Sequence, residues 1–278
     1  DGKASVYGSI QCPYYVKNAV VECLGTDPGN VRIVQLTTGG GFGGKEDYPS
    51  LIAGQAVCAA VKTGKPVQLI FDRDEDIEYT TKRHPSKIRL KSFLDSEYNI
   101  LGMEADIILD GGAYASLSSV VLQRSMFAAT GVYNIKNIKV RGRVVATNKA
   151  VSGAFRGFGG PQSFFAVEMH MEHMAKNFNL DPLKFKAQNM LHQGDTSGTG
   201  GTFRDKILLP EMIKKVDDMS SYKRKKEKFR IDRQNGILKG IGMSLFFHGG
   251  GFTGNGERDL IKAVAGLVKH ADGKVEIL

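Results

Sequence analysis

The chain has 278 residues, of which 41% are hydrophobic and 24% are charged, and its formal net charge is +9. These values exclude a disordered or collagen-like chain and predict one large globular domain or two subdomains. No apolar run reaches the roughly 18 residues of a membrane span. The three cysteines form no C-x-x-C motif. We therefore expect reduced thiols, a cytoplasmic location and no membrane partner.

The first expected element is a β-branched, alternating strand at Val31–Thr38, followed by a glycine loop and an Ala-rich helix at Ser50–Lys62. The other expected strands are Val67–Phe71, Ile88–Leu94, Leu101–Leu109, Ile138–Thr147, Gly240–Phe247, Ala263–His270 and Lys274–Leu278. The other expected helices are Ser119–Ala129, Pro161–Phe178, Pro182–Leu191 and Leu209–Phe229. Hairpins occur and no strict βαβ rhythm is kept. We predict an α+β fold of two-layer subdomains, with helices on mostly antiparallel mixed sheets.

Much of the positive charge lies in one short segment. Tyr222–Arg233 contains seven lysines and arginines against two acidic residues. Such a run is typical of a solvated helix face or a connector, and a nucleic-acid patch is the alternative. No nucleic-acid-binding motif accompanies the run, so we expect no nucleic-acid partner.

The first glycine loop is Gly39–Lys45, with Gly39, Gly41 and Gly44 in the spacing G-x-G-x-x-G. It lies between a predicted strand and a predicted helix, which is the context of a dinucleotide-binding motif. A nucleotide-binding reductase that uses Gly39–Gly44 is therefore one hypothesis, with Asp72 and Asp74 as candidate ribose ligands. Glu46 weakens this hypothesis, because an acid before the helix repels pyrophosphate. The same Glu46 replaces the Ser/Thr that a P-loop needs for magnesium.

The second glycine loop is Gly153–Gln162. Arg156 and two aromatic residues, Phe155 and Phe158, lie among four glycines, and Pro161 opens the following helix. Exposed backbone beside aromatic rings suits a flat aromatic ligand, and an arginine suits an anion. The loop therefore indicates a binding site, with a tight surface loop as the alternative.

Together the two loops, GGGFGGKE and AFRGFGGPQ, resemble the molybdenum-binding part of xanthine dehydrogenases and the wider molybdenum hydroxylase family, which includes aldehyde oxidases. The motifs occur in the family's order, about 110 residues apart. The resemblance covers roughly residues 1–200 and weakens through 201–278. It implies the first molybdenum-cofactor-binding domain of a hydroxylase in purine catabolism. Such an enzyme inserts water-derived oxygen into a purine or a related N-heterocycle.

The resemblance also implies roles for individual residues. The residues that it implies for binding the molybdenum–pterin cofactor are Gln11, Phe42, Gly43 and Arg156. The residues that it implies for binding substrate are Glu46, Arg124 and Phe158. A carboxylate and a guanidinium together favour a purine over a plain aldehyde, because negative charge grows on the purine during the reaction and a cation stabilises it.

The family's general base, a glutamate, is expected in a later molybdenum-binding domain, so we assign no catalytic residue to this segment and expect the fragment alone to be inactive. Glu168–His173 offers carboxylates and imidazoles one helical turn apart, a pattern more typical of a solvated face than of a metal site. We predict a cofactor-binding domain at 1–205, a charged helical connector at 206–239 and the truncated start of the next sheet at 240–278.

The resemblance implies partners as well. A second molybdenum-binding domain would complete the cofactor site, iron–sulfur centres and FAD would lie on other domains or subunits, and the protein could form a homo-oligomer. The alternative without catalysis is a scaffold half of a split molybdenum subunit, which would only complete a partner's site.

Overall fold

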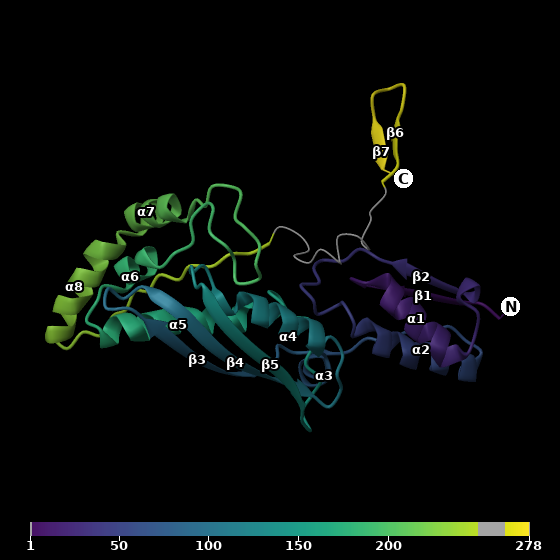
Figure 1. Ribbon diagram of the computed structural model, residues 1–278. Helices are drawn as coiled ribbons and strands as arrows, with labels where there is room; N and C mark the ends of the chain where they lie inside the picture. Colours follow the sequence, from purple (N-terminus) through teal and green to yellow (C-terminus); the bar gives the residue numbers. More distant parts are fainter. Residues whose placement is uncertain (1, 250–264, 278) are drawn as a thin grey trace. The chain divides into compact units, whose positions relative to one another are not determined.

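The computed structural model of the chain describes residues 2–249 and 265–277. Two compact units divide the chain, Asp1–Leu245 and Phe246–Leu278 (Figure 1). The first contains every described helix and two sheets, and the second contains the antiparallel strands β6 (Leu267–Lys269) and β7 (Val275–Ile277). Within the described residues, no helix is both long and apolar enough to cross a membrane.

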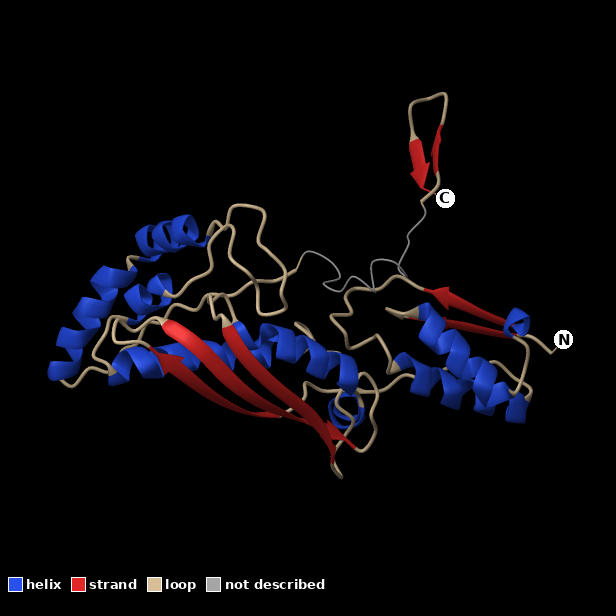
Figure 2. Cartoon of the chain, in the orientation of Figure 1, coloured by secondary structure: helices blue, strands red, loops and turns tan. Residues whose placement is uncertain are grey.

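The N-terminal layer of the first unit is a two-stranded parallel sheet with two helices. Strand β1 (Ala4–Gly8) pairs with β2 (Val31–Gln35), and α1 (Pro13–Leu24) connects them. Helix α2 (Pro49–Thr63) lies beside α1 (Figure 2). The apolar core of this layer consists of Ile10, Val16, Val20, Val31, Ala53 and Val57. Because β2 ends at Gln35 and α2 begins at Pro49, the first glycine loop lies between a strand end and a helix start.

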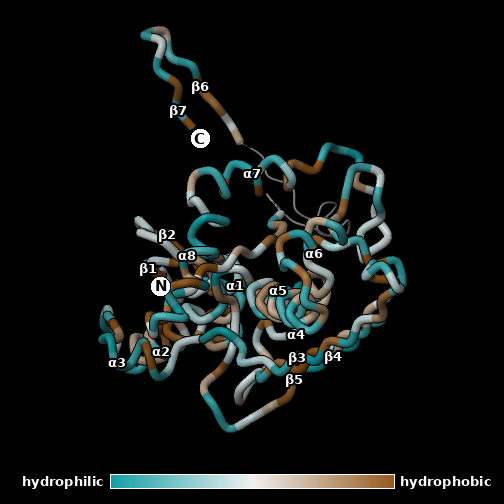
Figure 3. The backbone as a smooth tube through the Cα atoms, turned by 90° about the vertical axis from the view of Figure 1, so that its left-hand side faces the viewer, coloured by the Kyte–Doolittle hydropathy of each residue, from teal (hydrophilic) through white to brown (hydrophobic). Residues whose placement is uncertain are grey.

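The second layer is a three-stranded sheet of β3 (Ser86–Leu94), β4 (Ile100–Gly112) and β5 (Asn137–Ala146). Strand β4 runs antiparallel to β3 and parallel to β5. Helices α4 (Ser118–Phe127) and α5 (Gly160–Asn177) cover one face of this sheet (Figures 1 and 2). Buried and partly exposed residues alternate along β4, and Figure 3 shows hydrophilic and hydrophobic positions alternating along the strands. This period of two places the apolar side chains under the helices.

Shorter elements connect these layers. They are the 3₁₀ turns at Pro28–Asn30 and Ala128–Thr130 and the helices α3 (Arg73–Tyr79), α6 (Pro182–Gln188), α7 (Leu209–Ser220) and α8 (Tyr222–Gln234). Helix α3 begins with a capping box, in which Asp72 and Glu75 each accept a backbone N–H from the other. The cap satisfies backbone donors that a short helix would otherwise leave unpaired.

The α+β class predicted from the sequence is confirmed, and the described sheets contain two parallel and two antiparallel strand pairs. Three predicted elements are wrong. Val67–Phe71 and Gly240–Phe247 form no strand, because no neighbouring strand pairs with either segment in the described structure. The predicted helix Leu209–Phe229 is interrupted at Ser221, whose φ of 52° is left-handed, so that α7 and α8 are separate helices.

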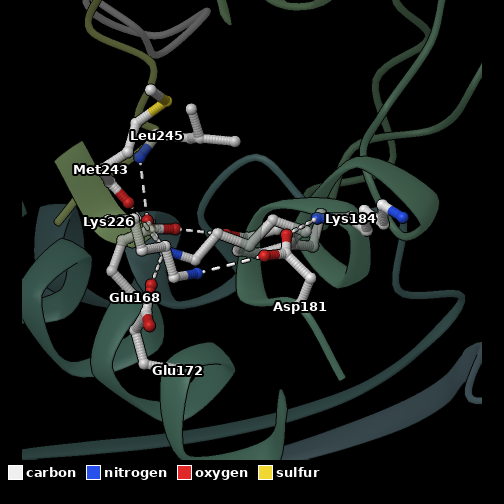
Figure 4. A network of polar contacts seen from close by, with 9 residues as sticks. Glu168, Glu172, Asp181, Lys184, Lys226, Met243 and Leu245 are labelled. Carbon is white, nitrogen blue, oxygen red and sulfur yellow. Dashed lines mark hydrogen bonds and ion pairs between the residues drawn. The ribbon is translucent and has the colours of Figure 1, made fainter. Parts of the chain in front are cut away.

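A buried ionic network fixes the last part of the first unit (Figure 4). The Lys186 side chain, 1% exposed, donates from Nζ to Glu168 at 3.1 Å, to Glu172 at 2.7 Å and to the Met243 carbonyl at 2.8 Å. Glu168 also accepts the Leu245 backbone N–H at 2.8 Å. Helices α5 and α6 thereby hold an extended segment that has no strand partner of its own.

Replacing Lys186 by Met should strongly destabilise the first unit. The substitution leaves the Glu168 carboxylate buried without its cation, which typically costs about 3–5 kcal/mol. Urea unfolding of the variant and the parent measures the difference. The matched control is Lys184→Met on the same helix, where the side chain is exposed and a change within about 0.5 kcal/mol is expected. Equal effects of the two substitutions would contradict the role assigned to the network.

Candidate functional site

The first glycine loop is held by Gln11. The Gln11 backbone N–H donates to the Lys45 carbonyl at 2.8 Å, and the Gly43 N–H donates to the Gln11 side-chain oxygen at 3.0 Å. A Cβ atom on Gly41 would lie 2.5 Å from the same oxygen, so a larger residue there would displace the Gln11 amide from the loop. Because the oxygen of the Gln11 amide is occupied by the loop, its NH₂ group is the end left to donate to a ligand.

The two glycine loops touch through their backbones. A Cβ atom on Gly43 would lie 2.7 Å from the carbonyl carbon of Ala154, so only glycine permits this contact. The Arg156 guanidinium carbon lies 5.2 Å from the ring centre of Phe42, which extends the contact between the loops. Phe42 is 66% exposed, so its ring is available to a bound group.

Each loop also contains one phenylalanine in the left-handed region. The φ angle is 50° at Phe42 and 48° at Phe158. A bulky residue rarely adopts this conformation, which costs free energy and persists where the surrounding contacts enforce it. Such residues cluster at binding and active sites, and here one occurs in each of the two segments that meet.

Arg124 connects the other two residues predicted to bind substrate, Phe158 in the second loop and Glu46 after the first. The Arg124 guanidinium carbon lies 5.9 Å from the ring centre of Phe158. Burial, and then the charge of Asp47, raise the pKa of Glu46, while the charge of Arg124 lowers it. Glu46 and Arg124 are therefore close enough to interact, and the carboxyl group lies in a less polar environment than water provides.

The structure thus brings together all seven residues predicted from the sequence. Gln11 contacts Gly43, Arg156 contacts Phe42, and Arg124 contacts Phe158 and is electrostatically coupled to Glu46. Their roles toward a cofactor or a substrate stay predictions.

Sequence reasoning missed the segment that lies against the second loop, residues 81–84. Thr81 and His84 are 3% and 2% exposed, and Arg83 donates to the Arg156 carbonyl. A short polar stretch before Pro85 is typical of an ordinary connection, so residue type and spacing did not predict that these residues belong to the site. A buried histidine is recognisable only once its partners are known.

His84 connects this segment to helices α4 and α5. One ring nitrogen, Nε2, lies 2.7 Å from the Ser118 hydroxyl at the start of α4, the helix that contains Arg124. The His84 carbonyl accepts from the Gln162 side chain at 3.2 Å near the start of α5. Burial lowers the pKa of His84, which favours the neutral ring in this position.

The segment Glu168–His173 takes no part in this site. Glu168 and Glu172 are paired with Lys186, and His170 lies 2.9 Å from the Ser92 hydroxyl. Within residues 2–249 and 265–277, no group of three His, Cys, Asp or Glu side chains is placed to hold a metal ion.

The residues present suit an anionic, flat group that brings its own metal. Such a group needs hydrogen-bond donors, a cation and ring surfaces from the protein, in place of side-chain ligands to the metal. Gln11 offers the amide NH₂, Arg156 offers the guanidinium and Phe42 offers an exposed ring. This combination fits a metal–pterin cofactor, which the two glycine loops would hold by hydrogen bonds and ring contacts.

Fold and site together define an α+β domain in which two glycine loops approach each other closely through their backbones. The family model described as "Molybdopterin cofactor-binding domain" matches residues 1–190. The chain belongs to this family.

Relatives and solved structures agree with this assignment. The chain is 33% identical over 276 residues to a probable xanthine dehydrogenase subunit of Bacillus subtilis, covering 99% of this chain and 36% of the relative. It is 34% identical over 218 residues to the nicotinate dehydrogenase large molybdopterin subunit of Eubacterium barkeri, covering 78% and 50%. The aldehyde oxidoreductase structure from Desulfovibrio gigas superposes with a TM-score of 0.73 at 33% identity, covering 83% and 25%. The chain therefore spans half or less of the length of these proteins.

Glu46→Gln should stabilise the first unit near neutral pH. Because the pKa of Glu46 is raised in the folded protein, the ionised carboxylate lowers the free energy of unfolding above that raised pKa. This decrease in the free energy of unfolding disappears as the pH falls through the raised pKa toward the ordinary value of 4.5, because the carboxyl group becomes protonated. The increase in Tm caused by Glu46→Gln should therefore be largest near pH 7 and should shrink toward pH 4.5.

The matched control for this measurement is Glu78→Gln on the exposed part of α3. This substitution should change the Tm little at any pH, because the Glu78 side chain stays hydrated in the folded protein. A Glu46→Gln variant that is less stable than the parent at pH 7 would show that the carboxylate is favourably paired instead.

Proposed function

We propose that this chain is the molybdenum-cofactor-binding portion of a xanthine-dehydrogenase-like hydroxylase that acts on a purine or a related N-heterocycle. The observation that carries the proposal is the grouping of Glu46, Arg124 and Phe158 beside the paired glycine loops. A purine offers a polar edge and a flat face, and the group supplies a carboxylate, a guanidinium and an aromatic ring. The names of relatives include xanthine and nicotinate, both N-heterocycles, and also aldehyde.

The residues of this chain would hold the cofactor and orient the substrate. The bound cofactor supplies the two-electron oxidation by which oxygen from water is added to carbon. Gln11 would donate from its NH₂ group to an oxygen of the cofactor, and Arg156 would neutralise part of its negative charge. Phe42 would cover one side of the cofactor, and Gly43 keeps the backbone of the first loop in place against Ala154.

On the substrate side, Phe158 would stack on the heterocycle, and the guanidinium of Arg124 would stabilise the negative charge that develops on it. The raised pKa of Glu46 makes its carboxyl group able to donate a proton to a ring nitrogen as well as to accept from a ring N–H. In this proposal the general base, iron–sulfur centres and FAD lie on other domains or subunits. The three cysteines form no disulfide, which suits a reducing, cytoplasmic compartment.

The loop geometry disfavours a nucleotide-binding reductase. A pyrophosphate site needs free backbone N–H groups, whereas those of Gly43, Gly44 and Glu46 already donate within the protein. Asp72, one candidate ribose ligand, instead caps helix α3 through Glu75.

Metal analysis of the full-length protein or assembly tests the proposal. We expect about one molybdenum and one pterin per copy of this chain, with little of either bound when residues 1–278 are produced alone. Retention of stoichiometric cofactor by the isolated chain would contradict the requirement for a second domain. A full-length protein with bound nucleotide and no molybdenum would support the reductase instead.

In the complete enzyme, Arg124→Met should remove the cation that stabilises the purine. The expected loss in kcat/KM is about 30- to 1000-fold, corresponding to roughly 2–4 kcal/mol. Glu46→Val should also weaken purine turnover, whereas turnover of a small aromatic aldehyde should be nearly unchanged or improved, because it has no purine edge to pair. Steady-state kinetics with both substrates measure this switch in preference. A parallel loss of both activities would assign the two residues to the cofactor or to the fold.

A further inference from the structure

Residues 81–84, between α3 and β3, form a bracket against the second glycine loop. The Lys82 N–H donates to the Val151 carbonyl at 3.2 Å, and the Gly153 N–H donates to the Lys82 carbonyl at 3.0 Å. A Cβ atom on Gly153 would lie 2.7 Å from Cγ2 of Thr81, so the loop begins in close contact with the bracket. The start of the loop is therefore fixed by backbone pairing.

Arg83 extends the bracket to the part of the loop that meets the first glycine loop. Its Nη2 donates to the Arg156 carbonyl at 2.6 Å, and its guanidinium carbon lies 4.9 Å from the ring centre of Phe155. Burial lowers the pKa of Arg83, whose side chain is half-buried against the loop. One guanidinium group thus contacts two consecutive residues of the loop, the carbonyl of Arg156 and the ring of Phe155.

The Arg83 hydrogen bond is made to the residue whose side chain reaches the first glycine loop. Gly157 and Gly159, which follow Arg156, both have a φ of 92°, and glycines leave a chain many conformations unless other contacts select one. A hydrogen bond to the Arg156 carbonyl fixes the backbone from which its side chain departs. That side chain then lies over Phe42 of the first loop.

We propose that Arg83 is a positioning residue that holds Phe155 and Arg156 in the orientation in which the second glycine loop meets the first, and that retention of the cofactor depends on it. The part about the cofactor rests on the proposed function, whereas the part about the loop does not. Lysine should not replace Arg83. A planar guanidinium spreads its donors and its charge over several atoms, so it can donate to the carbonyl and lie near the ring at once, whereas an ammonium group is a single compact charge.

The experiment compares Arg83→Lys and Arg83→Met in the full-length protein or assembly. Hydrogen–deuterium exchange reports the opening of residues 153–160, and metal analysis gives the molybdenum per chain. In both variants we expect these amides to exchange about tenfold faster, because a hydrogen bond from a charged group is lost. We also expect cofactor affinity to fall about 10- to 100-fold, the usual effect of removing a group that orients a binding residue.

The matched control is Arg141→Met, an arginine on the exposed face of β5, which should change neither readout. The Tm of both Arg83 variants should stay within about 3 °C of the parent, because the effect is confined to one loop. Arg83→Lys with parental exchange at 153–160 would overturn the positioning role. Faster exchange throughout the chain with a large fall in Tm would overturn it too, by making Arg83 a general structural residue.

The two proposals can fail separately. A parent protein without molybdenum would contradict the proposed function, and the exchange of residues 153–160 in the Arg83 variants would still decide the role of Arg83. A parent protein with molybdenum, together with variants that retain it fully and exchange normally, would contradict the role of Arg83 alone.

Discussion

The close approach of two backbones, Gly43 to Ala154, is the constraint on which the rest of the site depends. No side chain fits between them, since a Cβ atom on Gly43 would lie 2.7 Å from the Ala154 carbonyl carbon. The contact brings together segments more than 100 residues apart and sets the positions of Phe42 and Arg156 on either side of it. Because the backbone makes the contact, the side chains of Phe42 and Arg156 are not needed for it.

Buried charges are compensated by opposite charges in the core but less so at the candidate site. In the network around Lys186, the cation faces two carboxylates and a carbonyl, so its charge is well compensated (Figure 4). At the site, burial raises the pKa of both Glu46 and Asp47, and the charge of Asp47 adds to the rise at Glu46. Polar groups that cost stability in this way are typical of a site arranged for a ligand. Glu46 and Glu168 are both at least partly shielded from water, but Glu168 is paired with the Lys186 cation whereas Glu46 lies near the second carboxylate, Asp47.

The elements that sequence reasoning predicted well are those specified locally. The alternation along Leu101–Leu109 and the proline after Gly159-Gly160 identified β4 and α5, because side-chain period and helix-start chemistry act over a few residues. The errors have a different origin. Val67–Phe71 has the composition of a strand, but a strand exists only beside another strand, and in the described residues none lies there. At Ser221 the helix ends without glycine or proline, through a left-handed serine that no sequence pattern announces.

The sequence by itself determined the class of fold and the two glycine loops, because long motifs of unusual composition are specific even when read alone. The roles of the seven residues of the candidate site stay predictions from the family resemblance. Only the tertiary structure decided that the loops meet at Gly43 and Ala154, and that Arg83 and His84 support them from a segment with no motif. The physical reason is the range of the interactions. Backbone conformation and amphipathic period are local properties, whereas the value of a buried hydrogen bond or a close backbone contact depends on a partner far along the chain.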